Sequence, residues 1–172
     1  EKREYKYAQN MLFPRMYSDQ HAHLYEKWSS PVTNLVPAEN YEYTGKQYIK
    51  MPTQWDNLRF FINYQVNHMY WRYFLWNFVG RQNDIQSHGE KEHGNWITGI
   101  PFLDEIRLGN MDKLPESLKE NKGRNVFFAL PLILGIIGLI WQAKKGCEGK
   151  RQLLVVGMLF FMTGLAIVLY LN

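Results

Sequence analysis

The sequence has almost no cysteine. Its 172 residues include one, Cys147. A single thiol cannot form a disulfide within the chain, which excludes the disulfide frameworks that hold many small secreted domains together. Cys147 is interpreted as an inert loop residue.

The sequence also lacks a broad excess of positive charge. Its formal net charge is +4, yet residues 1–124 carry 16 Lys and Arg against 15 Asp and Glu. The rest of the excess lies in one short segment, residues 143–152. Nucleic-acid-binding surfaces spread basic residues over a face or a helix, so a nucleic-acid partner is not expected.

Familiar catalytic motifs are missing as well. The sequence contains no nucleophile elbow, no phosphate-binding loop and no dinucleotide fingerprint, so no cofactor is evident. It contains no internal repeat or low-complexity tract. Its composition is 46% hydrophobic and 16% aromatic, which excludes a disordered chain.

Two long apolar runs stand near the end of the sequence, Asn125–Trp141 and Leu153–Leu171. A bilayer-spanning helix needs about 20 apolar residues. The alternative, two core helices of a soluble protein, is disfavoured because so small a domain could hardly cover helices that are apolar on every face. We therefore predict a mainly α membrane protein with transmembrane helices at 125–142 and 153–171, which form a hairpin.

The segment between the runs predicts the orientation of this hairpin. Residues 143–152 include Lys144, Lys145, Lys150 and Arg151, and positive charge beside membrane helices is retained in the cytoplasm. Residues 1–124 and Asn172 are then expected on the periplasmic side of a multi-pass inner-membrane protein. The sequence starts at Glu1 without a signal peptide, so we expect a piece of a longer polytopic protein.

The predicted extracytoplasmic part is α-rich and has three sections. Residues 1–52 are expected to form loops and short helices, one of them around Ser18–Trp28. Residues 53–81 hold a long aromatic helix. Residues 82–124 are rich in Gly and Asn and predict loops with short helices at Leu103–Leu108 and Pro115–Glu120.

The long helix has clear end signals. Thr53 is a suitable N-cap, Asp56 stands near the positive end of the helix dipole, and Gly80 is a natural stop, which predicts a helix over 54–79. Two polar stripes alternate with aromatic rings along it. This pattern suits a helix at a membrane interface, where Trp and Tyr have one apolar and one wet side. The stripes contain Arg59, Asn63, Asn67, Tyr70, Asn77 and Arg81 in one, and Gln65, His68 and Arg72 in the other.

Three polar clusters are candidates for chemistry. The cluster of His88, Glu90, Glu92 and His93, like the pair His21 and His23, matches no known ligand spacing, so no metal site is expected. The adjacent carboxylates Asp104 and Glu105 are candidates for general-base work, although a solvated first turn of a short helix is the favoured interpretation.

The third cluster combines arginines with amides beside the aromatic rings. Arginine donates two parallel hydrogen bonds to phosphate, so these side chains are candidates for binding the phosphate of a lipid-linked substrate. The alternative is a buried structural network in which Arg81 pairs with Asp84 and Asn77 caps the helix end. The candidate residues are Arg15, Arg72, Asn77, Arg81, Asn83 and Asp84.

Several long segments resemble a family of large bacterial inner-membrane proteins that is similar to the protein O-mannosyltransferases of the GT-C glycosyltransferase superfamily. They are Pro14–Ser18, Asp56–Phe61, Met69–Asp84 and Gly94–Glu105. The resemblance runs in the same order from about Met11 into the second apolar run. It implies an enzyme that transfers sugar from a polyprenyl-phosphate carrier to exported proteins.

The resemblance has two gaps. In GT-C enzymes the catalytic carboxylate follows the first transmembrane helix, and Asp104–Glu105 does not match that position. An expected arginine- and tyrosine-rich run after the second apolar run is also missing. No catalytic residue is therefore assigned, and the chain is expected to be a central-to-C-terminal part of such a protein.

The expected partners follow from this interpretation: the lipid bilayer, a lipid-linked sugar, an exported acceptor protein and the remainder of the polytopic protein. The alternative is a non-catalytic membrane subunit whose extracytoplasmic segment docks a partner in an envelope complex.

Overall fold

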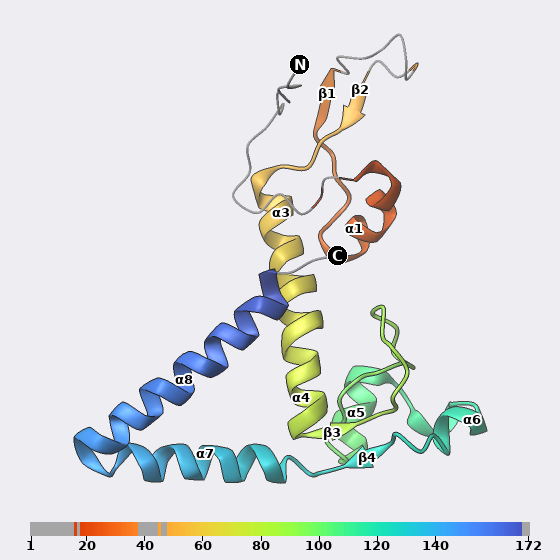
Figure 1. Ribbon diagram of the computed structural model, residues 1–172. Coiled ribbons are helices and arrows are strands. Elements are labelled where there is room, and N and C mark those ends of the chain that lie inside the picture. The colour runs from red at the N-terminus through yellow and green to blue at the C-terminus, as the bar shows by residue number, and fades with distance from the viewer. Residues whose placement is uncertain (1–15, 17, 38–44, 46–47, 170–172) are drawn as a thin grey trace, which may run out of the picture. The chain divides into compact units, whose positions relative to one another are not determined.

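The computed structural model describes residues 16, 18–37, 45 and 48–169 (Figure 1). The chain divides into two units, residues 1–66 and 67–172.

The first unit contains short helices and one small sheet. A 3-10 turn at Asp19–His21 leads into α1, Ala22–Trp28, close to the helix predicted around Ser18–Trp28. Strand β1, Leu35–Pro37, pairs antiparallel with β2, Tyr48–Lys50, so that Val36 lies opposite Ile49. This pairing was not predicted.

Helix α3, Gln54–Phe60, starts as its sequence indicates. Thr53 and Asp56 form a capping box, in which each side chain accepts a hydrogen bond from the other residue's backbone N–H. The buried Phe60 ring meets Tyr25 of α1 edge to face at 5.3 Å, and the Asn57 side chain accepts a hydrogen bond from the N–H of Met16 at 3.1 Å. These contacts join α1 to α3.

A π-helical stretch, Phe61–Trp71, follows α3 and leads into α4, Arg72–Phe78. Helical residues thus run from Gln54 to Phe78, where the sequence predicted 54–79. A π-helix bonds residue i to i+5, so the faces of the 3.6-residue pattern are not maintained through it. The predicted polar stripes do not both face solvent, because Gln65 and His68 are buried.

The second unit is built around the end of α4. Strand β3, Gly80–Arg81, pairs antiparallel with β4, Asn125–Val126, and Trp96 bridges to Arg81. A Cβ on Gly80 would lie 2.6 Å from the carbonyl oxygen of Ile97. Gly80 does follow the helix end, and it also leaves room for this close approach.

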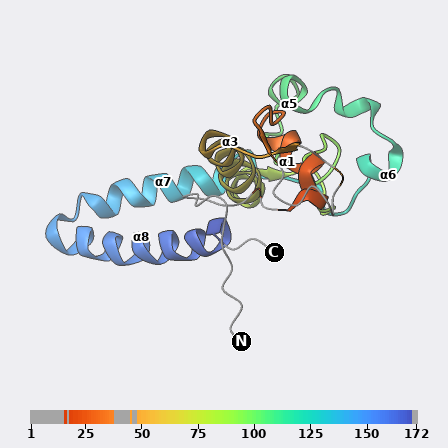
Figure 2. The same cartoon turned by 90° about the horizontal axis from the view of Figure 1, so that it is seen from above.

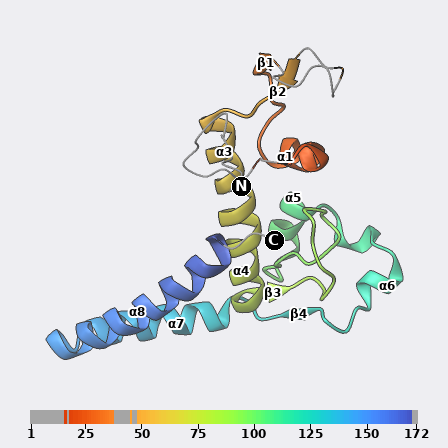
Figure 3. The ribbon, with the colours of Figure 1, turned by 45° about the horizontal axis from the view of Figure 1, so that its top comes forward.

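Short elements and two longer helices complete the second unit (Figure 1). The short elements are α5, Pro101–Leu108, a 3-10 turn at Met111–Lys113, and α6, Glu116–Lys119. The longer helices are α7, Leu130–Ala143, and α8, Gly146–Leu169. Figure 2 shows α7 and α8 side by side from above, and Figure 3 shows them diverging from their connecting turn.

The predicted transmembrane hairpin is wrong. Within the described part of the chain, no helix combines the length and the apolar character that crossing a membrane requires. The opening residues of the first apolar run form β4 and a turn. Helix α7 therefore has 14 residues and is about 21 Å long, at 1.5 Å per residue. Helix α8 begins within the predicted basic loop, and its first turns carry Glu148, Lys150 and Arg151.

The same finding corrects the predictions that depended on the hairpin. It overturns the membrane fold class, the multi-pass inner-membrane placement and the periplasmic location of residues 1–124. The interpretation of residues 53–81 as an interfacial helix rested on that hairpin and is withdrawn with it. Asn172 lies outside the described residues. The helical character of the chain remains.

Candidate functional site

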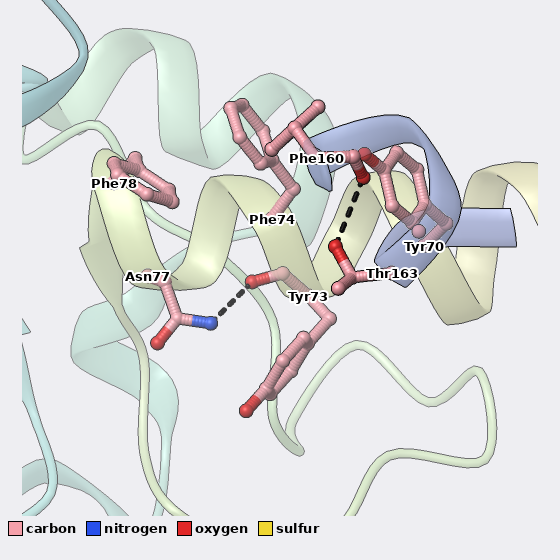
Figure 4. A pocket seen from close by; sticks show the side chains of 8 residues that line it. Tyr70, Tyr73, Phe74, Asn77, Phe78, Phe160 and Thr163 are labelled. Carbon is pink, nitrogen blue, oxygen red and sulfur yellow. Dashed lines mark hydrogen bonds between the residues drawn. The ribbon is translucent and has the colours of Figure 1, made fainter. Parts of the chain in front are cut away.

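A groove of about 150 Å³ lies between α4 and α8 within the second unit (Figure 4). Aromatic rings form most of its wall. Helix α4 and the end of the π-helical stretch supply one side, and α8 supplies the other. The lining residues are Tyr70, Tyr73, Phe74, Asn77, Phe78, Phe160, Thr163 and Gly164.

Phe160 joins the two sides of the groove. Its ring meets Tyr70 at 6.4 Å and Phe74 at 5.8 Å, both edge to face. A Cβ on Gly164 would lie 2.7 Å from the Tyr70 ring, so only glycine permits this approach. At three other glycines of α7 and α8, an added Cβ would meet no atom within 4 Å: Gly135, Gly138 and Gly157.

The polar groups of the groove are few. The Thr163 hydroxyl donates to the carbonyl of Leu159 at 2.9 Å, and the Asn77 amide donates to that of Tyr73 at 2.9 Å. Burial raises the pKa of the Tyr70 phenol above its ordinary value. The groove is therefore suited to an apolar ligand portion, with Asn77 at a polar edge.

Arg81 stands next to that edge, held between aromatic rings. Its guanidinium lies 4.0 Å from the centroid of Trp76 and 5.7 Å from that of Phe127. Trp76 is fixed because its indole N–H donates to the carbonyl of Asn83 at 3.0 Å. Strand pairing of β3 with β4 places Phe127 one residue beyond the ladder. The fold thus positions the Arg81 head group on both sides.

The Arg81 guanidinium keeps most of its hydrogen-bonding capacity. It has five N–H donors. Its Nη2 donates to Asn77 Oδ1 at 3.3 Å, while its buried Nε has no acceptor among the described residues. Neither ion pair found in the described part of the chain includes Arg81. An anion at the edge of the groove would meet this cation through its Nη groups, because the Nε is shielded from solvent.

Arg72 differs from Arg81 in this respect. Its Nε donates to the carbonyl of His68 at 3.0 Å, and its Nη1 donates to that of Gly94. The first bond lies within the helical segment, and the second fastens that segment to the loop that ends at Gly94. The sequence did not distinguish the two arginines, whereas their surroundings assign Arg72 a structural role.

Asn83 is fully buried and also structural. Its amide donates to the carbonyl of Glu92 at 2.7 Å, and its Oδ1 accepts from the N–H of Gly94 at 2.7 Å. Asp84 is exposed and packs against Gly123, where a Cβ would lie 2.7 Å from that of Asp84. Arg15 lies outside the described residues.

The alternative network expected from the sequence forms only in part. Arg81 bonds to Asn77 and makes no ion pair with Asp84 among the described residues. The Asn77 amide bonds back to Tyr73 one turn earlier. Of the six predicted residues, the structure brings Asn77 and Arg81 together at the groove.

The remaining candidates for chemistry have structural explanations or no assembled site. Asp104 is buried and accepts hydrogen bonds from the N–H groups of Thr98 and Gly99 at 2.8 and 2.9 Å. Arg107 lies 3.7 Å from Asp104; burial lowers the pKa of its guanidinium, while the charge of Asp104 opposes that shift. Glu105 is exposed.

No group of three or more His, Cys, Asp or Glu side chains that could hold a metal ion occurs within the part of the chain that the structure describes. Sequence analysis missed the α8 side of the groove, because Phe160, Thr163 and Gly164 were assigned to a membrane span.

Comparisons with known proteins yield one match. A family model described as a family of unknown function (DUF8416) matches residues 1–62. No curated protein and no solved structure matches the chain. The matched segment ends before the first residue of the groove, and none of these comparisons links the chain to glycosyltransferases.

Proposed function

We propose that the chain binds the phosphate of an isoprenoid-linked sugar at Arg81 and so contributes donor binding to a glycosyl transfer of the GT-C type. The reaction class rests on the resemblance of segments such as Met69–Asp84 to the O-mannosyltransferase-like family. The binding residue rests on its surroundings. No catalytic residue is assigned to this chain.

The observation that carries the proposal is the Arg81 guanidinium, which lies near the rings of Trp76 and Phe127 and makes one hydrogen bond among the described residues. Charge-assisted hydrogen bonds from a guanidinium to phosphate are short and often paired. The cost of ordering such a side chain on binding is reduced when rings already hold it in place.

The groove supports the choice of an isoprenoid ligand over a free anion. Asn77 both lines the groove and bonds to Arg81, so the apolar wall and the cation adjoin. A ligand with its phosphate at Arg81 would place the start of its hydrocarbon chain against Phe74 and Phe160. The volume of about 150 Å³ is enough for a short part of such a chain.

The test is calorimetric titration of the purified chain with farnesyl phosphate, a soluble isoprenoid monophosphate. Farnesol and inorganic phosphate are titrated in parallel, because each lacks one half of the ligand. We expect farnesyl phosphate to bind more tightly than either. Arg81→Gln should weaken its binding about 10- to 100-fold, since each charge-assisted hydrogen bond contributes about 1.5–3 kcal/mol.

The matched control is Arg124→Gln, which removes the same charge from an exposed position in the same unit. It should leave the affinity unchanged. Arg81→Lys keeps the charge without the planar fork and should fall between wild type and Arg81→Gln. Equal affinities for farnesol and farnesyl phosphate, or wild-type binding by Arg81→Gln, would refute the proposal.

The second candidate, a non-catalytic subunit that docks a protein partner, is favoured by α5. Its inner face is polar, with Asp104 buried, whereas Phe102 and Ile106 are each 71% exposed. The partner that fits is an apolar helix with a basic residue opposite the exposed Glu105. Glycosylation of exported proteins in cells separates the candidates: donor binding needs Arg81, and docking needs Phe102 and Ile106.

A further inference from the structure

The connection between β4 and α7 has an unusual backbone. Phe128 and Ala129 are consecutive residues with φ of +50° and +56°. The N–H of Leu130 donates to the carbonyl of Phe127 at 2.9 Å and closes a tight turn around them. Turns with positive φ at both central positions normally contain Asn or Gly, because a Cβ crowds the backbone there.

The turn is therefore strained at two successive positions. For a residue with a Cβ, the left-handed conformation is disfavoured by about tenfold or more relative to the right-handed one. Neither Phe128 nor Ala129 has a side chain that can bond locally and offset this cost. The strain persists because neighbouring contacts hold the turn in place.

Two contacts hold the turn on the side of the strands. The N–H of Ala129 donates to the carbonyl of Val79 at 3.2 Å. Gly99 packs so closely that a Cβ there would lie 2.1 Å from Val126 and 2.9 Å from Phe128. The residues before the turn are thus fixed to the body of the second unit.

On its other side the turn carries α7 and α8. Apolar side chains along both helices are largely exposed, for example Leu134 at 58% and Leu159 at 66%. The far part of α8 returns to the body at Phe160 and Gly164, which contact Tyr70. The hairpin is attached at one end by the strained turn and by contacts of α7 with α4, and at the other end by a small aromatic contact.

We propose that Phe128 and Ala129 form a sprung hinge, about which the α7–α8 hairpin swings to open and close the groove. Docking of α8 on Tyr70 and Phe74 fixes the direction of α7 and so, together with the strand-side contacts, holds the turn in the left-handed conformation. Release of α8 removes this constraint and allows the turn to relax. The strain offsets part of the docking energy, so the docked arrangement is favoured by less than its contacts alone would give.

This hinge does not depend on a ligand, and its test contains none. If the hinge proposal fails, the proposed function is not affected. If the proposed function fails, the hinge proposal is not affected. Spin labels on the exposed Cys147, at the start of α8, and on Glu105→Cys, on α5, report the swing as a distance distribution by pulsed electron paramagnetic resonance.

Gly164→Ala, which places a Cβ against Tyr70, should produce a second distance population in which α8 is released. Adding Ala129→Gly to this variant should shift the populations about tenfold back towards the docked distance, because glycine tolerates positive φ. The control is Ala143→Gly, the same substitution at the other end of α7, and it should not shift them.

Two results would overturn the proposal. One is a single docked distance in Gly164→Ala, because a poised hinge must release when its contact is crowded. The other is an equal effect of Ala129→Gly and Ala143→Gly, which would mean that strain at Ala129 does not oppose docking.

Discussion

Residues 82–95 and the α7–α8 hairpin lie in the same unit but are held by opposite kinds of interaction. In the loop, Gln82 and Asn83 are buried and donate to the carbonyls of Lys91 and Glu92 at 2.8 and 2.7 Å. Asn95 donates to several further carbonyls of the same loop. In the hairpin, the contacts with the rest of the unit are few and aromatic.

The difference concerns what each region leaves available to a ligand. The side-chain amides of the loop form their hydrogen bonds with the backbone of the same loop. Arg72 also donates to a carbonyl of this loop, that of Gly94. The Arg81 side chain, at the border between the two regions, makes one hydrogen bond among the described residues, to Asn77. Ligand binding is therefore expected at the border, while the loop supplies rigidity.

The largest expected loss of stability comes from a substitution in the hydrogen-bonded loop, residues 82–95. Asn83→Ala removes the hydrogen-bond donor to the carbonyl of Glu92 and the acceptor of the N–H of the buried Gly94. Each such group costs about 1–3 kcal/mol, so the free energy of unfolding should fall by about 3 kcal/mol. Urea denaturation followed by circular dichroism measures it.

Asn110→Ala is the control for this loss. Asn110 is exposed and accepts one hydrogen bond, from the N–H of Asp112 at 2.8 Å. Its substitution should cost about 1 kcal/mol or less. Equal losses in the two variants would mean that the buried amides do not hold the loop.

A smaller change in the free energy of unfolding is expected in the hairpin, where substitution of two glycines should have opposite effects. Gly157→Ala adds a methyl group in open space and should stabilise α8 by up to about 1 kcal/mol, since alanine favours helix. Gly164→Ala adds one against the Tyr70 ring and should destabilise the unit by about 1–3 kcal/mol.

Thermal denaturation of both variants checks the pair. Stabilisation of both to the same extent would show that α8 does not pack on Tyr70 in solution.

The smallest expected effect is a pH dependence at Tyr70. Burial raises its pKa in the folded state above the ordinary value of 10.0. Above that pH the unfolded chain loses the proton first, so the stabilising contribution, complete below pH 10, decreases as the pH rises further. Tyr70→Phe should remove this part of the alkaline loss.

Denaturation of wild type and Tyr70→Phe between pH 7 and 11 tests this difference. The two curves should run parallel up to about pH 9, and above it the stability of the wild type should fall more steeply than that of Tyr70→Phe. Curves that stay parallel throughout would place the phenol in water.

Local signals in the sequence predicted local structure. Thr53 and Asp56 identified the start of α3 because a capping box involves residues three apart. The helices at Ala22–Trp28 and Pro101–Leu108 lie where short helices were predicted. The π-helical winding of Phe61–Trp71 has no comparable local signal, and it displaced the faces inferred from a 3.6-residue period.

Features that depend on distant residues could not be predicted in this way. Pairing of Gly80–Arg81 with Asn125–Val126 joins segments about 45 residues apart, and it takes Asn125 and Val126 out of the first apolar run. The sequence selected Arg72 and Arg81 together, because residue type and spacing do not reveal which acceptors surround a guanidinium. The two arginines could be distinguished only from the structure, in which the carbonyls of His68 and Gly94 accept hydrogen bonds from Arg72.

Whether Arg81 is available to a phosphate while Arg72 is not can be tested by NMR of the arginine side chains in the wild-type chain. The guanidinium signals of both residues are followed while farnesyl phosphate is added. We predict a large shift for Arg81, whose guanidinium makes one hydrogen bond among the described residues, and little change for Arg72, whose Nε and Nη1 bond to the carbonyls of His68 and Gly94. An unchanged Arg81 signal at saturating ligand, or a shift confined to Arg72, would contradict it.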